Sequence, residues 1–75
     1  MSYGYTRYLI DANRKAPGTL GVQLGEWAIG KNVPVSQVAA RLGVSRQTVY
    51  NWFIGKHEPS EELEKLIRKY ARIKS

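Results

Sequence analysis

The chain has 75 residues and a formal net charge of +6 at pH 7, from twelve Lys and Arg against six Asp and Glu. A chain this short buries only about 60% of its unfolded surface, so we expect one domain over residues 1–75. It contains no cysteine and one histidine, which excludes disulfides, thiolate metal sites and clusters of soft metal ligands. No stretch approaches the roughly 20 apolar residues of a membrane span. We therefore expect a cytoplasmic protein with no cofactor and no small-molecule substrate.

The positive charge is unevenly distributed along the chain. Of the six acidic residues, only Asp11 and Glu26 precede His57. Clustered positive charge raises both the affinity and the encounter rate for phosphate backbones, so a polyanionic partner is the first expectation. Charge alone does not decide the matter, because many small basic proteins owe their charge to solubility. His57 has no Ser, Cys or paired carboxylate at a supporting position, so the sequence does not indicate an enzyme.

The first half of the chain predicts two helices. Apolar residues at helical spacing, namely Tyr5, Tyr8, Leu9 and Ala12, indicate a helix over about residues 5–15, and Ala16-Pro17-Gly18 ends it. A second helix is expected over about residues 19–29. It contains Gly21 and Gly25, each costing roughly 1 kcal/mol relative to alanine. This cost indicates that a neighbour packs closely there, and we expect the first helix, with a DNA backbone as the alternative.

Residues 35–56 contain the most informative pattern in the chain. Val38 and Leu42 lie four apart, and Val49 and Trp52 lie three apart, so two short helices direct apolar stripes at a shared core. Gly43 stands where a left-handed turn is needed between them. Ser45 is placed to cap the second helix, with Val44 and Val49 as a hydrophobic staple. This spacing is typical of a helix-turn-helix.

A last helix is predicted over about residues 60–73. Ser60 is its expected N-cap, acidic residues occupy its first turn and basic residues its end, as a helix dipole favours. Its apolar face is expected to consist of Leu63, Leu66, Ile67, Tyr70 and Ile73. Because no strand pattern or internal repeat is present, the predicted fold is all-α, a compact five-helix bundle containing the helix-turn-helix.

The stretch from Pro34 to Ser60, PVSQVAARLGVSRQTVYNWFIGKHEPS, resembles the helix-turn-helix of the Cro/C1 phage-repressor family, also called the XRE type. The resemblance covers both motif helices, Trp52, Gly55, Lys56 and the Pro59-Ser60 that opens the next helix. The helices predicted on either side also fall where that family has them. The resemblance implies that the second motif helix lies in the major groove of double-stranded DNA and reads base edges with its early residues.

The resemblance also implies which side chains contact DNA. Arg46, Gln47 and Asn51 match positions that face the bases, and their chemistry agrees, since arginine pairs with guanine and amides with adenine. Tyr50, like Ser45 and Thr48, also faces outward and is expected to touch a phosphate or a thymine methyl, and we count Tyr50 among the base contacts. Expected contacts to the phosphate backbone, which position the domain without specifying sequence, come from Ser36, Gln37, Ser45, Thr48, Lys56 and His57.

Several aromatic and apolar residues leave alternatives open. Phe53 and Ile54 depart from the family pattern and could pack on the extra N-terminal helix or form a dimer contact. Trp27 and Trp52 are expected in the core, since each lies on an apolar stripe. The tyrosines at positions 3, 5 and 8 could be disordered, packed or laid on DNA, and we expect them to be packed or frayed.

Three functions compete at this point. The leading hypothesis is a sequence-specific DNA-binding transcriptional regulator, in particular a small phage or prophage repressor that binds DNA as a homodimer. A DNA-recognition accessory factor for recombination, packaging or transposition is the second. The third is a protein-interaction module that binds RNA polymerase or a toxin.

Overall fold

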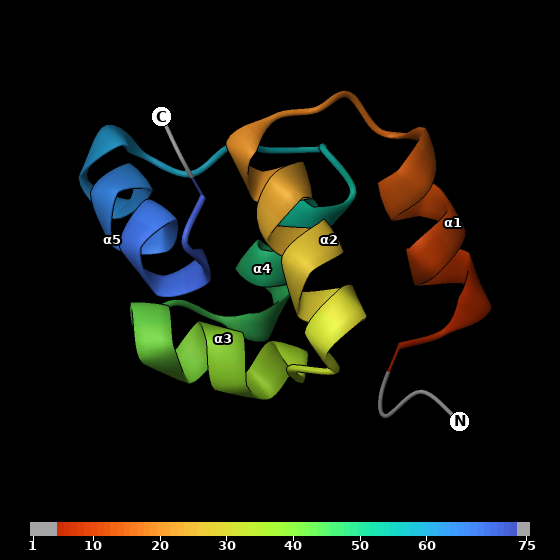
Figure 1. The fold of residues 1–75 in the computed structure, drawn as a ribbon, viewed down its shortest axis with the longest axis horizontal. Helices are drawn as coiled ribbons and strands as arrows, with labels where there is room; N and C mark the ends of the chain where they lie inside the picture. Colours follow the sequence, from red (N-terminus) through yellow and green to blue (C-terminus); the bar gives the residue numbers. More distant parts are fainter. Residues whose placement is uncertain (1–4, 74–75) are drawn as a thin grey trace.

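Five helices joined by short connections make up most of residues 5–73, the part of the chain that the computed structural model describes (Figure 1). They are α1 (Arg7–Lys15), α2 (Leu20–Lys31), α3 (Val35–Leu42), α4 (Arg46–Phe53) and α5 (Glu61–Ala71). Residues 5–73 contain no strand. Within that range no helix has the length and hydropathy to cross a bilayer. The predicted all-α fold with five helices is confirmed.

Hydroxyl side chains define where four of the helices begin. The side chains of Thr6, Thr19, Ser45 and Ser60 accept hydrogen bonds from the backbone amides three residues later, at Leu9, Val22, Thr48 and Leu63. Each bond satisfies one amide that the first helical turn leaves without a partner. The predicted caps at Ser45 and Ser60 are therefore confirmed. The last helix ends at Ala71, two residues earlier than predicted, because Arg72 adopts a left-handed conformation with φ of 56°.

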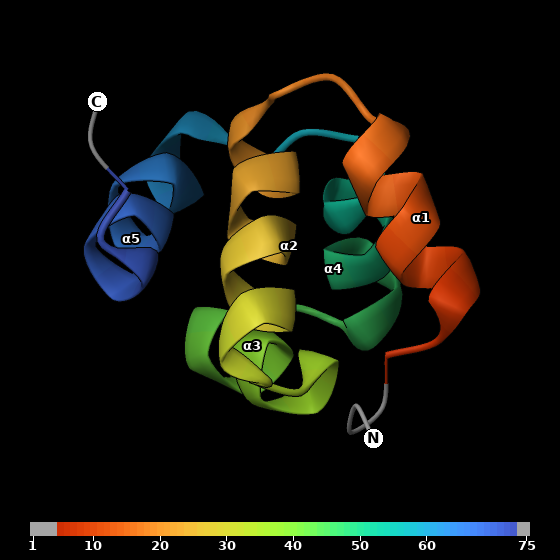
Figure 2. The same cartoon turned by 45° about the vertical axis from the view of Figure 1, so that its right-hand side comes forward.

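Helix α2 lies at the centre of the bundle, with α5 on one side and α1 on the other (Figure 2). Its Leu24 and Ala28 side chains are completely buried. They share one core with fully buried side chains from the other helices, including Val38, Val49, Phe53 and Ile67. Burying an aliphatic or aromatic side chain of this size contributes about 1.5–3 kcal/mol, so this core supplies most of the favourable free energy of folding.

The two glycines of α2 mark where α4 approaches it. A Cβ atom on Gly21 would lie 2.8 Å from the Cβ of Trp52, and one on Gly25 would lie 2.8 Å from the Phe53 ring and 2.6 Å from the Asn13 amide nitrogen. The expectation that the first helix packs here is wrong for Gly21 and holds only in part for Gly25. Helix α4 is the main neighbour because its buried face carries Trp52 and Phe53 one after the other.

Phe53 is buried within the chain, against the N-terminal helix. Asn13, only 4% exposed, donates hydrogen bonds from Nδ2 to the carbonyl oxygens of Phe53 (2.7 Å) and Val22 (3.0 Å). The Tyr5 ring lies 6.3 Å from the Phe53 ring. Of the two alternatives for Phe53, packing on the extra helix is therefore the correct one. Ile54 is half-buried and packs against the same core.

Tyr5 ties the start of α1 to the connection between α2 and α3. Its hydroxyl donates a hydrogen bond to the Val33 carbonyl oxygen, and its side chain is only 4% exposed. Burial, followed by the nearby Tyr50 and Tyr70, raises the pKa of Tyr5 from 10.0 to about 12. Helix α1 is thus fixed to the rest of the bundle near both ends, by Tyr5 and by Asn13.

The aromatic and apolar faces differ from the prediction at three positions. Tyr8 is 77% exposed and Leu66 is 51% exposed, so neither belongs to a core stripe. In α1 the buried residues Leu9 and Asn13 are four apart, and Tyr8 lies about 100° around the helix from Leu9. The prediction of a core position is correct for Trp52, whereas Trp27 is half-buried with its ring 5.1 Å from that of Tyr70. Tyr3 lies outside the described residues.

Candidate nucleic-acid interface

The turn between α3 and α4 has the geometry that its sequence predicts. Gly43 has φ of 70°, and no atom lies within 4 Å of where its Cβ would be, so conformation rather than space requires glycine there. The Val44 amide donates to the Ala39 carbonyl oxygen at 3.0 Å, which closes α3. The Ser45 hydroxyl accepts from the Thr48 amide at 3.2 Å, which opens α4. The angle between the two helices is therefore fixed by local hydrogen bonds as well as by packing.

Both apolar stripes of the motif lie in the core as predicted. Val38 and Val49 are fully buried, while Leu42 and Trp52 are 6% and 3% exposed. Because these residues occupy the inner face of each helix, the opposite faces are exposed, with Ala40 and Arg41 on α3 and Arg46 and Gln47 on α4. The orientation of the outer face of α4 follows from this packing.

The outer face of α4 carries the side chains expected to read bases. Arg46 and Gln47 are exposed, and Asn51 is half-buried. Gln47 donates a hydrogen bond from Nε2 to Oδ1 of Asn51 at 3.2 Å. That bond leaves Gln47 Oε1 as an acceptor and Asn51 Nδ2 as a donor for a partner outside the chain. An adenine presents the complementary pair in the major groove, a donor at N6 and an acceptor at N7.

Arg46 lies in the first turn of α4 and is available for an external partner. Across residues 5–73 the ion pairs join Arg7 with Asp11 and Arg68 with Glu64, so none of them engages Arg46. Helix α4 itself contains no acidic residue. A guanidinium without an internal carboxylate retains its planar set of donors for guanine or phosphate.

The remaining polar residues of α4 lie at its edges. Thr48 is half-buried, and its hydroxyl lies 2.9 Å from that of Ser45. Tyr50 is half-buried and packs on the core on the side of α4 that faces α1. The structure therefore places Ser45 and Thr48 together at the start of the helix and Tyr50 on its flank.

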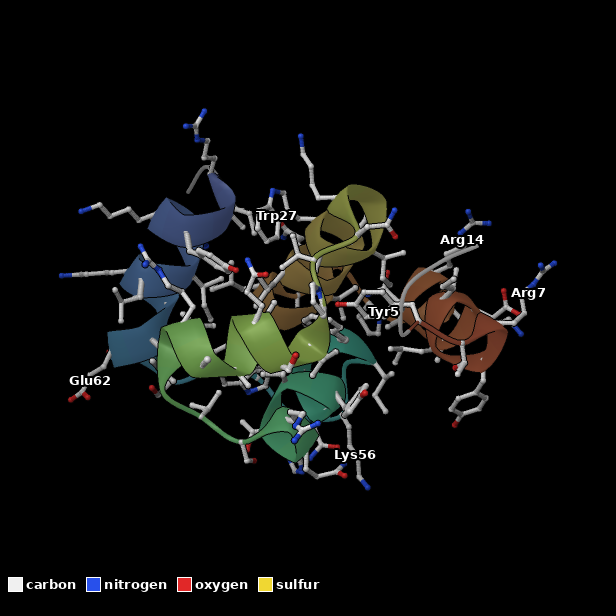
Figure 3. The ribbon with its side chains drawn as sticks, turned by 90° about the horizontal axis from the view of Figure 1, so that it is seen from below. Tyr5, Arg7, Arg14, Trp27, Lys56 and Glu62 are labelled. Atoms are coloured by element: carbon white, nitrogen blue, oxygen red, sulfur yellow. The ribbon has the colours of Figure 1, made fainter. Side chains whose placement is uncertain are left out.

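The residues expected to hold phosphates come from two segments beside α4. Ser36 and Gln37 are exposed in the first turn of α3, and Lys56 and His57 are exposed after α4. The backbone amides of Lys56 and His57 donate to the Asn51 carbonyl oxygen at 2.9 and 3.3 Å, so this turn is well ordered by hydrogen bonds. Figure 3 shows Lys56 projecting from the outer edge of α4, on a different side of the bundle from Glu62. The Glu62 side chain therefore points away from Lys56.

Comparison with known proteins identifies the class. The model of the family described as Helix-turn-helix matches residues 29–72, more than half of the chain. The chain therefore belongs to the Cro/C1 (XRE) type of helix-turn-helix protein, and it is a DNA-binding transcription regulator of that type. No curated protein and no solved structure gives a significant match. Helix α1 and most of α2 precede the matched residues.

The described residues also include a surface that the sequence did not indicate. A groove runs between α1 and α4, lined by Thr6, Tyr8 and Leu9 on one side and by Gln47, Tyr50, Asn51 and Ile54 on the other. The groove was missed because the sequence pattern placed Tyr8 in the core, and no local signal distinguishes an exposed tyrosine from a buried one. Within residues 5–73 no group of His, Cys, Asp or Glu side chains is placed to hold a metal ion.

Proposed function

We propose that this protein is a sequence-specific repressor of the phage or prophage type, which inserts α4 into the major groove and blocks a promoter. The observation that supports this proposal best is the outer face of α4. It presents Arg46 together with the hydrogen-bonded pair Gln47 and Asn51, none of which the core uses. Arginine and paired amides are the side chains that discriminate bases in the major groove.

In this proposal, Arg46 forms a bidentate contact with a guanine, and the pair of Gln47 and Asn51 reads an adenine. Tyr50 reaches a thymine methyl from the flank of the helix. Contacts to phosphates come from the exposed or edge residues Ser36, Gln37, Ser45, Thr48, Lys56 and His57. The phosphate contacts set the register of α4 on the duplex, and the base contacts give the specificity.

We further propose that two copies bind one operator. A single α4 reaches only a few base pairs, whereas two copies related by a two-fold axis place two recognition helices about 34 Å apart on one face of the DNA. Sedimentation of the saturated complex is expected to give two chains per site. One chain per site at saturation would contradict the dimer.

Selection of bound DNA from a random pool tests sequence specificity. We expect enrichment of a palindromic motif with half-sites about 34 Å apart, because each half-site meets the same α4. A pool that shows no enriched motif after binding would contradict specific recognition. Transcription in vitro from a promoter overlapping the selected site is expected to fall when the protein is added. A rise in transcription would contradict repression while leaving DNA binding intact.

A further inference from the structure

The groove between α1 and α4 opens beside the residues proposed to read bases. Three of its α4 residues, Gln47, Tyr50 and Asn51, are members of that set. Its lining contains no charged side chain, so it presents apolar and hydrogen-bonding atoms without a carboxylate to repel a phosphate. The groove is thus continuous with the proposed DNA interface, and the inference below depends on that proposed function.

Tyr8 forms the outer rim of this groove and is the most exposed large hydrophobic side chain in residues 5–73. Its neighbours on α1 are fixed, because Leu9 is 7% exposed and Asn13 is bonded to two backbone carbonyl oxygens. Helix α1 therefore cannot rotate to bury Tyr8 without breaking those contacts. The ring and hydroxyl of Tyr8 are held out in solvent from a rigid element.

The positions of α3 and α1 on either side of α4 indicate what meets Tyr8. Figure 3 shows α3 along one side of α4 and α1 beyond the other. An α-helix with its side chains is about 10–12 Å across, and the major groove is about 12 Å wide. A helix that fills the groove brings its two flanking elements onto the two DNA strands that border it. Helix α3 then meets one sugar-phosphate backbone, and α1 meets the other.

We propose that α1 forms part of the DNA interface. In this proposal α3 contacts one DNA strand, and Tyr8 contacts the other. The Tyr8 hydroxyl donates a hydrogen bond to a phosphate oxygen, and its ring packs on the adjacent deoxyribose. The local charge of α1 agrees with this partner. Lys15, seven residues after Tyr8 and so on the same side of the helix, is exposed and basic, and the single acid of α1, Asp11, lies 3.9 Å from the Arg7 guanidinium.

Two variants of the full chain test the proposal against a selected site. We expect Tyr8→Ala to weaken binding about tenfold, or about 1.4 kcal/mol. Tyr8→Phe is expected to weaken binding almost as much as Tyr8→Ala, because it keeps the ring but lacks the hydroxyl donor. The loss is expected to be equal on sites with altered bases, since phosphate contacts do not read sequence. The salt slope is expected to stay unchanged, because a neutral side chain releases no counterion. Leu66→Ala is the matched control, an exposed apolar residue on α5.

Ethylation interference provides the positional measurement. With the parent protein, ethylation of one phosphate on the strand beside α1 is expected to block binding, and this signal is expected to vanish for Tyr8→Ala. Parent-like affinity and an unchanged interference pattern for Tyr8→Ala would overturn the role of α1. That result would leave the proposed function standing as long as Arg46→Ala still weakens specific binding. A parent protein that selects no DNA sequence would overturn both.

Discussion

The contact between α2 and α4 predicts opposite effects for the same substitution at two positions of one helix. Replacing a helical glycine by alanine ordinarily stabilises a protein by about 0.5–1 kcal/mol, because glycine loses more backbone entropy on folding. Gly30 lies in α2 with no atom within 4 Å of the position its Cβ would take. Gly30→Ala is therefore expected to raise the free energy of unfolding by about 0.5–1 kcal/mol.

Gly21 has no space for the same methyl group. Its Cβ would lie 2.8 Å from the Trp52 Cβ and 2.9 Å from the Trp52 carbonyl oxygen. A backbone oxygen and a Cβ atom cannot move by a change of side-chain rotamer, so the clash can be removed only if α2 and α4 move apart. Overpacking of this kind costs about 1–3 kcal/mol, which outweighs the gain in helix propensity. We expect Gly21→Ala to lower the free energy of unfolding by about 1–2 kcal/mol.

Urea denaturation followed by circular dichroism measures both variants against the parent protein. For a domain of this size, 1 kcal/mol corresponds to about 4–8 °C in Tm, so thermal melts give an independent check. Because α4 carries the proposed base contacts, Gly21→Ala is also expected to weaken DNA binding. Equal stabilisation by both substitutions would refute the close contact between α2 and α4.

Three further predictions follow from particular contacts. Asn13→Ala is expected to lower the free energy of unfolding, measured by urea denaturation, by about 2–4 kcal/mol, because two buried carbonyl oxygens lose their donor. A decrease below about 0.5 kcal/mol would contradict this role of Asn13. The free energy of unfolding is expected to fall as the pH rises from about 10 toward 12, because the pKa of Tyr5 is higher in the folded than in the unfolded protein. In Tyr5→Phe this decrease between pH 10 and 12 is expected to be smaller. Lys56→Ala is expected to reduce the slope of log affinity against log salt concentration by about 0.9, whereas the control Lys69→Ala is expected to leave it unchanged. The same slope for Lys56→Ala and the parent protein would show that Lys56 does not contact a phosphate.

The helix-turn-helix could be predicted because its signals are local. Gly43 and Ser45 act through their own backbone conformation and hydrogen bonds, so a single sequence contains the information. The periodicity of Val38, Leu42, Val49 and Trp52 then gives the inner faces of both helices. The same reasoning failed for Tyr8 and Leu66, because apolar residues beside a core stripe fit a helical period almost as well as those on it.

The attachment of α1 could not be predicted because it depends on contacts distant in sequence. Asn13 bonds to the carbonyl oxygen of Phe53, forty residues later, and Tyr5 to that of Val33, twenty-eight residues later. An asparagine within a helical pattern gives no sign that it will be buried. The groove between α1 and α4, and with it the exposed position of Tyr8, follows from these same contacts. The exposed positions of Arg46 and Gln47 on α4 were predictable because they lie opposite its buried stripe, whereas Tyr50, which was expected to face outward, is half-buried and packs on the core.

The most direct test of the central claim compares the parent protein with Arg46→Ala on the selected site and on random DNA. A bidentate contact to guanine predicts a loss of about 1–3 kcal/mol on the selected site, a much smaller loss on random DNA and relaxed preference at one base position per half-site. Arg46→Lys is expected to recover only part of the affinity, because an ammonium lacks the planar fork. Unfolding should be unchanged, since Arg46 is exposed. Parent-like binding by Arg46→Ala, or an equal loss on both DNAs, would contradict recognition of bases by α4.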